Sequence, residues 1–215
     1  MSMCKVFFSV SVSLDGYLVP PGMDIAHAED PTFEDWAAQW GKLQSWILPQ
    51  RFFREMLTLG GGGETGTDNE IVEHTFRRTG VSIMGKRMFE LGEQMWPEQA
   101  PFHTPVFVLT SQVRAPWVRP GGTTFTFVND GIESALRQAR AVAGDRDIRI
   151  AGGADVIQQY LRAGLVDEFA LAISPVMFGG GRRLFEAISR EVGVDLVETI
   201  ASPRVTHVRY AVRER

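Results

Sequence analysis

From residue 79 onward, short apolar runs alternate with segments of helical character, and this alternation restricts the fold more than any other feature. Strand-like runs such as "VSIM", "PVFVLT" and "EFALAIS" are separated by "IESALRQARAVA" and similar stretches. Two consecutive strands that are connected by a helix run parallel to each other, because the helix carries the chain back along the sheet. The pattern predicts an α/β fold with a mostly parallel central sheet flanked by helices.

Both ends of the chain are expected to add strands to this sheet. Apolar residues alternate with mostly polar ones over residues 6–14, which predicts a first strand. "DLVETIA" and "RVTHVRYAV" predict a C-terminal antiparallel strand pair. Residues 179–188 are expected to form a loop with a short helix.

The length of 215 residues and the 44% of hydrophobic residues suit one domain, residues 1–215, with a helical and loop insertion at about 25–78. Within the insertion, helices are expected at about 31–46, 49–59 and 68–78. Aromatic residues near 33–53 are expected mainly to pack this insertion, although some could line the pocket of a planar substrate.

Charge and cysteine content exclude several classes of protein. The net charge is −4 and no basic run is present, which disfavours nucleic acid as a partner. Cys4 is the single cysteine, so an internal disulfide and paired-cysteine zinc or redox sites are excluded. The four histidines have no metal-site spacing, and no apolar run approaches the ~20 residues of a membrane span. We expect a cytoplasmic protein without a metal that acts on a small molecule.

The stretch "GGGGETG", residues 60–66, matches the dinucleotide pattern G-x-G-x-x-G through Gly61, Gly63 and Gly66. That pattern binds phosphate only where it follows a strand, and the preceding "RFFREMLTL" is helical in character. Glu64 within the match would also repel phosphate. We therefore interpret this stretch as a mobile loop.

A stronger signal stands at Gly152 and Gly153, between the strand "IRIA" and a helix that begins at Ala154. A helix N-terminus offers unpaired N–H groups and the positive end of its dipole, and glycine lets a bulky anion approach the backbone. The pair is interpreted as a pyrophosphate cradle. The alternative, two glycines that only form a tight turn, stays open.

Two further strand ends carry groups that suit anions. Gly85, Lys86 and Arg87 stand where "VSIM" meets a helix, and their alternative interpretation is a solvated basic turn. Thr110 and Ser111 end "PVFVLT", with Arg114 nearby, and hydroxyls with a guanidinium suit a ribose 2′-phosphate. Three such corners fit one dinucleotide lying across the carboxyl edge of the sheet.

The motifs "SVSLDGYL", "VSIMGKRMFELG", "VFVLTSQ" and "IRIAGGADVIQQYLRAGLVDEFAL" resemble, in this order, the dihydrofolate reductase superfamily. The chain is most similar to the reductase domain of the bifunctional riboflavin-synthesis deaminase/reductases and its stand-alone relatives. The resemblance covers most of the chain outside about 25–78. It implies a dihydrofolate reductase-like fold, hydride transfer from NADPH and a homodimer. By the resemblance, the cofactor-binding residues are Val10, Ser11, Gly85, Lys86, Arg87, Thr110, Ser111, Gly152, Gly153, Ala154 and Asp155.

The chain departs from the folate enzymes at two places that grip folate. Ala172 stands where those enzymes have a threonine, and Thr104 stands near the place of their glutamate-binding arginine. The riboflavin-type relatives share the "SLDG" stretch, in which Asp15 could orient substrate or deliver a proton through water. Its alternative role is a turn aspartate that binds the backbone. The zinc signature of a deaminase needs more than one cysteine, so the chain is expected to be at most the reductase half.

Three residues are candidates for substrate binding: Asp35 and Trp36 near the start of the first helix, and Arg182 in "GGGRR". Their alternatives are a solvated helix face, core packing and a surface turn. The sequence favours an NADPH-dependent reductase acting on a C=N or C=O group of a small polar substrate. The resemblance compares it with the 5-amino-6-(5-phosphoribosylamino)uracil reductase of riboflavin biosynthesis. A weak dihydrofolate reductase and a non-catalytic NADP(H)-binding or sensing protein are the alternatives.

Overall fold

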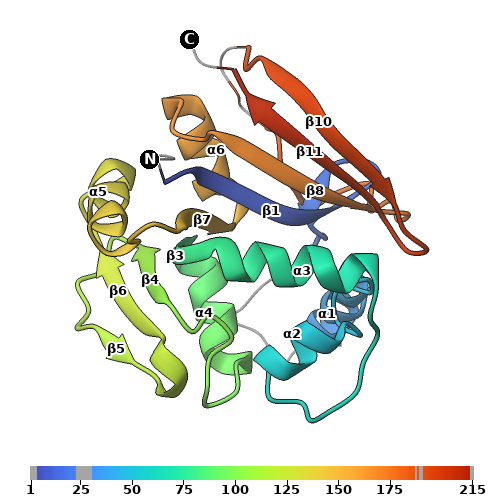
Figure 1. The fold of residues 1–215 in the computed structure, drawn as a ribbon, viewed down its shortest axis with the longest axis horizontal. Coiled ribbons are helices and arrows are strands. Elements are labelled where there is room, and N and C mark those ends of the chain that lie inside the picture. The colour runs from blue at the N-terminus through green and yellow to red at the C-terminus, as the bar shows by residue number, and fades with distance from the viewer. Residues whose placement is uncertain (1–3, 23–30, 187, 189–190, 214–215) are drawn as a thin grey trace.

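A computed structural model describes residues 4–22, 31–186, 188 and 191–213 (Figure 1). Nine of its strands form one sheet in the order β10-β11-β8-β1-β7-β3-β4-β6-β5, and β2 and β9 form a separate pair. The strands are β1 (Val6–Ser13), β2 (Tyr17–Val19), β3 (Thr79–Gly85), β4 (Pro105–Leu109), β5 (Trp117–Val118), β6 (Thr124–Val128), β7 (Asp147–Gly152), β8 (Glu168–Ser174), β9 (Arg182–Arg183), β10 (Val194–Ala201) and β11 (Thr206–Val212). The helices are α1 (Pro31–Leu43), α2 (Arg51–Met56), α3 (Thr67–Arg78), α4 (Lys86–Met95), α5 (Ile132–Val142), α6 (Ala154–Ala163) and a short 3-10 turn at Pro120–Gly122.

The centre of the sheet is parallel, as the alternation of strands and helices predicts. Strands β8, β1, β7, β3, β4 and β6 pair in parallel with one another in this order, and β5 is antiparallel to β6. The C-terminal pair β10–β11 is antiparallel and joins the sheet through an antiparallel pairing of β11 with β8. The expected α/β fold and its C-terminal strand pair are therefore confirmed.

The two faces of the sheet differ in polarity. Ile148 and Ile150 of β7 are fully buried in a core that contains apolar residues of α5 and α6. Arg149, which alternates with them, points to the opposite face, where its guanidinium lies over the Phe76 ring of α3. Ser11 of β1 shares this second face, and its hydroxyl donates to Gln44 and accepts from Trp46. This face is the one that α3 covers (Figure 1).

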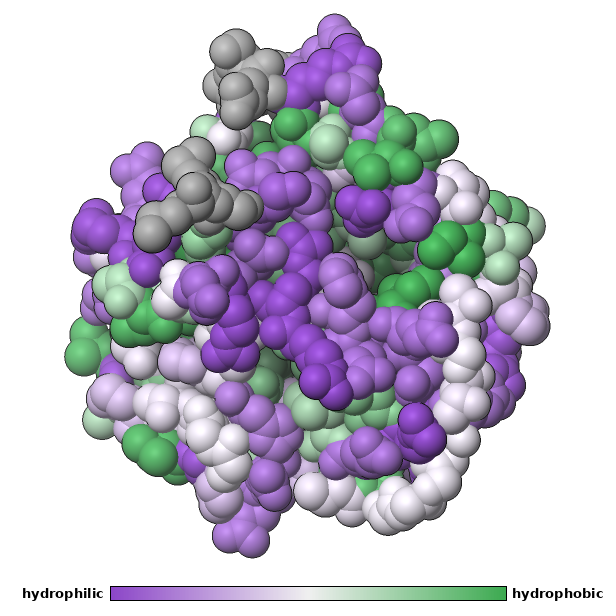
Figure 2. Space-filling model, in the orientation of Figure 1, coloured by the Kyte–Doolittle hydropathy of each residue, from purple (hydrophilic) through white to green (hydrophobic). Residues whose placement is uncertain are grey.

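Helix α3 is amphipathic, which explains how it covers a polar sheet face. Val72 is buried and packs with Trp46 and Ala172, whereas Glu70 and His74 face solvent. Figure 2 shows mostly hydrophilic residues over the region of α3 on the solvent side. The segment between α1 and α3 is thus docked on the sheet. Residues 25–30 of the expected insertion lie outside the described residues.

A network of ion pairs fastens the C-terminal end of α3 to the starts of β7 and β8. Arg78 donates to Asp147 at 2.7 Å and to Glu168 at 2.6 Å, and Lys5 donates to Glu168 at 2.7 Å. Burial opposes the charge on Glu168, but the hydrogen bonds from Lys5 and Arg78 outweigh it and lower the pKa of the carboxyl. The same guanidinium stacks 4.1 Å from the centre of the Phe7 ring.

The prediction of a short helix within residues 179–188 is wrong for the described residues of this segment. Arg182 and Arg183 instead form β9, which pairs antiparallel with Tyr17 and Val19 of β2. Gly181 has φ +111°, and a Cβ there would lie 2.1 Å from the Val19 carbonyl oxygen. A backbone held so close to a neighbouring strand is extended and cannot coil into a helix.

No helix within the described part of the chain is long and apolar enough to span a membrane. The described residues also contain no cluster of three or more histidine, cysteine or acidic side chains that could hold a metal ion.

Candidate functional site

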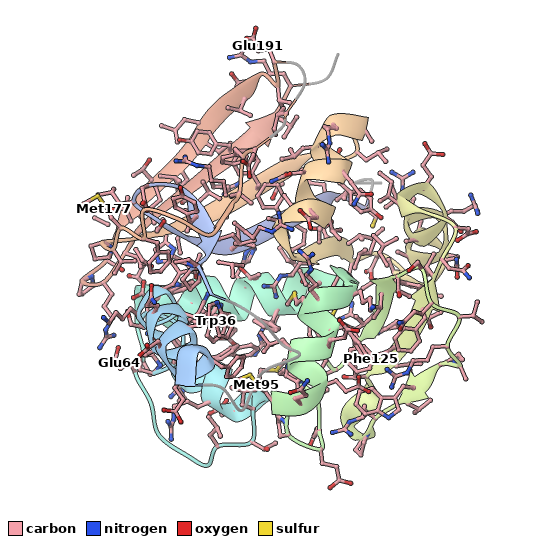
Figure 3. The ribbon with its side chains drawn as sticks, turned by 180° about the vertical axis from the view of Figure 1, so that it is seen from behind. Trp36, Glu64, Met95, Phe125, Met177 and Glu191 are labelled. Atoms are coloured by element: carbon pink, nitrogen blue, oxygen red, sulfur yellow. The ribbon has the colours of Figure 1, made fainter. Side chains whose placement is uncertain are left out.

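One cavity of about 1420 Å³ runs between the sheet, α1–α4 and α6. Its size exceeds that of a typical pocket for one drug-sized ligand, so there is room for a cofactor and a substrate together. We call its two parts the glycine end and the aromatic end. The glycine end is lined by Gly85, Lys86, Arg87, Gly152, Gly153, Ala154, Asp155, Gly181 and Arg182, and the aromatic end by Trp36, Trp40, Trp46, Phe53, Phe76 and Arg149. In Figure 3, Trp36 of α1 and Met95 of α4, which also lines the cavity, are seen between these two helices.

The three corners predicted from the sequence are neighbours at the carboxyl edge of the sheet. Met84 pairs with Gly152, and Gly85 pairs with Leu109, the residue before Thr110. A Cβ placed on Gly85 would lie 3.8 Å from the Gly153 nitrogen. The strand order β7-β3-β4 therefore brings the corners side by side, at the edge where open α/β sheets bind ligands.

The Gly152–Gly153 corner has the space and the free donors that an anion needs. Its peptide bond is cis, and Gly152 has φ +138°, which side-chain-bearing residues rarely adopt. A Cβ on Gly153 would meet no atom within 4 Å. Gly85 and Gly153 are the N-caps of α4 and α6, and neither helix has a side-chain cap. Two helix N-termini thus leave N–H donors for a ligand beside the cavity.

The cations at the glycine end form exposed ion pairs. Lys86 lies 3.3 Å from Glu90, and the carboxylate of Asp155 lies 3.6 Å from Arg87 and 3.4 Å from Arg182. Exposed pairs of this kind are weak, so a phosphate can replace the carboxylates at little cost. Arg182, which the sequence suggests for substrate, is placed with Asp155 and hence at the glycine end.

Thr110 and Ser111 do not line the large cavity. Thr110 lines a separate pocket of about 50 Å³ together with Lys86 and Arg114, whereas Ser111 is exposed and lines neither space. The Arg114 guanidinium donates to both carboxylate oxygens of Glu93, which raises its pKa. The sequence suggests Arg114 as a partner for a 2′-phosphate, but in the structure its charge is already neutralised by Glu93.

Val10 and Ser11 of β1 line the cavity where β1 separates from β7. The pairing of β1 with β7 stops at Phe7, whereas its pairing with β8 continues to Ser13. This divergence exposes the β7 side of β1 to the cavity. The Ser11 hydroxyl is already used, because it donates to Gln44 and accepts from Trp46.

Asp15 is held by the backbone and does not line the cavity. Its carboxylate accepts from the Ser13 hydroxyl at 2.6 Å and from the Gly179 and Phe178 N–H groups at 2.7 and 3.1 Å. These bonds, led by that of Ser13, lower its pKa to about 2, so it carries no proton to donate at neutral pH. The contacts favour the turn aspartate over the catalytic acid.

Of the two candidates on α1, Trp36 lines the cavity and Asp35 is exposed away from it. Ala172 packs on Trp46, and its cross-strand neighbour His207 bonds to Asp68 of α3 at 2.8 Å. Neither Asp68 nor His207 reaches the cavity. The described residues of the aromatic end therefore contain no carboxylate that could grip a pterin as folate enzymes do.

Sequence reasoning missed Arg149, which lines the aromatic end. The available signal was a charged residue between two isoleucines in "IRIA", since a central strand covered on both faces is normally apolar throughout.

The geometry defines a dihydrofolate reductase-like α/β protein with a ligand cavity at the carboxyl edge of its sheet. Residues 4–208 match the family model described as the RibD C-terminal domain, and the chain belongs to this family. The match runs through residues 25–78.

Two relatives from Bacillus subtilis (strain 168) share shorter stretches. The uncharacterized protein YyaP is 37% identical over 73 residues, which cover 34% of this chain and 38% of that protein. The uncharacterized protein YwjB is 28% identical over 85 residues, or 40% of this chain and 48% of that protein. The aligned stretches thus span less than half of either relative.

Three solved structures share the fold at low sequence identity. A Shewanella sp. PV-4 protein, provisionally named for riboflavin biosynthesis, has a TM-score of 0.65 at 17% identity and covers 98% of this chain and 99% of its own. The deaminase/reductase of Thermotoga maritima has a TM-score of 0.57 at 14% identity, covering 98% of this chain and 57% of its own. The dihydrofolate reductase of Enterococcus faecalis, solved with NADP(H), has a TM-score of 0.54 at 14% identity, covering 98% and 97%.

Proposed function

We propose that the chain is an NADPH-dependent reductase that transfers a hydride to a C=N or C=O group of a small polar substrate. The observation that carries this proposal is the meeting of two uncapped helix N-termini at Gly85 and Gly153, in a cavity that continues into an aromatic chamber. The likeness of the fold to a dihydrofolate reductase solved with NADP(H) supports it.

The glycine end fits a dinucleotide. Gly152, Gly153 and the first turn of α6 would hold the pyrophosphate, because a Cβ at Gly153 would occupy space that is open. Lys86 and Arg87 would hold phosphate by exchanging their carboxylate partners for it. Val10 and Ser11 would offer backbone groups to the nicotinamide amide where β1 leaves β7. When bound, NADPH supplies the hydride, and the protein positions the reacting groups and excludes water.

The aromatic end would hold the substrate. Trp36, Trp40 and Phe76 give it walls that suit a planar ring. The reduction needs no protein nucleophile, and the proton would come from water, since Asp15 lies outside the cavity. Ala172 and the pairing of Asp68 with His207 argue against folate as the natural substrate.

Turnover tests the proposal directly. Purified protein is incubated with NADPH and a panel of small carbonyl and imine compounds, and loss of the reduced-nicotinamide absorbance is followed. We expect oxidation of NADPH that depends on both the substrate and the protein, and that is lost in Gly153→Val. Binding of NADPH without turnover on a broad panel would favour a sensing protein, and absence of binding would overturn both functions.

A homodimer is also part of the proposal. Strand β10 is an open edge of the sheet, and its Leu196 and Val197 are 61% and 48% exposed. An open strand edge with apolar side chains can pair with a second copy. Light scattering on the purified protein should give twice the mass of one chain, and Leu196→Lys should reduce that mass to one chain.

A further inference from the structure

The floor of the aromatic end contains a positive charge, the guanidinium of Arg149, that the described residues do not neutralise. Within the described part of the chain, the Arg149 guanidinium has one hydrogen bond, 3.4 Å from Nη2 to the Ser9 carbonyl oxygen, and no carboxylate partner. Its Nε is buried and has no partner, and its other neighbour is the Phe76 ring, 4.9 Å from the guanidinium carbon to the ring centre. A partly buried cation without a counter-charge costs the fold free energy.

A second donor at the same end is also unsatisfied. The Trp36 indole Nε1 is buried without a hydrogen-bond partner. Among the described residues, five buried side-chain polar atoms lack partners, and the two that belong to cavity-lining residues are both N–H donors of the aromatic end. Buried donors are normally paired, so the fold lacks acceptors at this end of the cavity.

The other charges of the cavity lie elsewhere. Its acidic lining residues in the described part of the chain are Glu90 and Asp155, which pair with Lys86, Arg87 and Arg182 at the glycine end. The Ser11 hydroxyl, which also lines the cavity on this sheet face, already bonds Gln44 and Trp46. Burial lowers the pKa of Arg149 to about 10, so the guanidinium is still charged at neutral pH.

We propose that Arg149 is a substrate-binding residue that pairs with a carboxylate, and that the hydride acceptor is a planar ring compound bearing that carboxylate. A guanidinium binds a carboxylate through two parallel N–H groups, which fixes the orientation of the ring as well as its affinity. The aromatic walls of Trp36, Trp40 and Phe76 then pack the ring. This inference deepens the proposed function and rests on it for the assignment of the ligand as substrate.

Two probes of the same shape, one with a carboxylate and one with a neutral amide, test the inference. Calorimetric titration with 1-naphthoate and with 1-naphthamide compares a carboxylate and an amide on the same planar ring. We expect the protein to bind naphthoate at least about tenfold more tightly than naphthamide, because a charged hydrogen bond is lost with the amide. Arg149→Met should remove this preference, and Arg149→Lys should keep part of it. Arg77→Met, an equal change of charge on the solvent face of α3, should leave it unchanged.

Equal affinity for the two probes, binding of neither, or a preference that survives Arg149→Met would overturn the inference. The comparison of the two probes on the unaltered protein decides the matter even if a variant fails to fold. The titrations need no nicotinamide cofactor, so their failure is distinct from that of the proposed function. A chain that binds NADPH but shows no preference for naphthoate refutes the role of Arg149 alone.

Discussion

Two arginines on the same face of the sheet have opposite surroundings. Arg78 stacks on Phe7 and is bonded to Asp147 and Glu168, so its charge is cancelled within the fold. Arg149 stacks on Phe76 and has no carboxylate partner in the described part of the chain. The first arginine fastens α3 to the sheet, and the second lines a cavity. The difference teaches that a charge left unpaired by the fold points to a ligand, whereas a paired one points to stability.

The largest effect is expected where the charges cancel. Arg78→Met leaves Asp147 and part of Glu168 without their partner, which typically costs about 3–5 kcal/mol of the free energy of unfolding when a buried pair is broken. Denaturant unfolding measures it. A loss below about 1 kcal/mol would show that this network contributes little to stability. Arg78 would then not be the stabilising arginine of the two.

At the glycine end the cations are paired but exposed, so their removal should act on binding rather than on folding. Replacing Lys86 and Arg87 with alanine should weaken NADPH by about 1–3 kcal/mol and NADH by less, because charged contacts to phosphate are lost. Titration with each cofactor measures the difference, and Arg77→Ala is the matched control. Equal weakening for both cofactors would show that these cations do not distinguish the 2′-phosphate.

Acid should act on the network around Arg78. The folded-state pKa of Glu168 lies below its usual value of 4.5, so its contribution to stability is complete above that pH and is lost as the pH falls through the folded-state pKa. One such proton changes the free energy of unfolding by at most about 1.4 kcal/mol per pH unit. Glu168→Gln should be less stable than the natural chain at neutral pH, and this deficit should shrink in acid. A deficit that stays constant down to the lowest pH would remove Glu168 from the network.

The smallest effect on stability is expected at Arg149. Arg149 is a partly buried cation without a carboxylate partner among the described residues. Exchanging it for an apolar side chain of similar length removes a desolvation cost, so Arg149→Met should keep or raise the free energy of unfolding, within about 1 kcal/mol. The same denaturant series measures it. A loss as large as that of Arg78→Met would mean that Arg149 stabilises the fold, and the contrast between the two arginines would disappear.

The sequence predicted those parts of the fold that depend on local patterns. Strands β3, β4, β7 and β8 stand out because a strand covered on both faces is a mostly apolar run, which in β7 only Arg149 interrupts. Strands β2, β5 and β9 are two or three residues long, too short for a pattern to mark them. Strands β2 and β9 exist only through pairing with each other, far apart in the chain. The helix expected near Arg182 failed for the same reason.

The candidate site divides in the same way. The glycine corners could be predicted, because Gly152 and Gly153 are visible in the sequence between an apolar strand and a helix. The partners of Asp15 could not, since they come from residues 178 and 179, far along the chain. The role of Arg149 depends on α3 and α1 covering its face of the sheet, which the strand "IRIA" does not reveal.

The most direct test of the account is titration of the purified chain with NADPH, beside Gly153→Val and Gly61→Val. A Cβ at either position meets no atom within 4 Å and neither glycine has a positive φ, so both variants should fold. The account predicts that NADPH binds the natural chain and Gly61→Val equally well and does not bind Gly153→Val. The reason is that, of these two glycines, Gly153 lines the cavity and Gly61 does not. Absence of binding to the natural chain, or binding that persists in Gly153→Val, would contradict it.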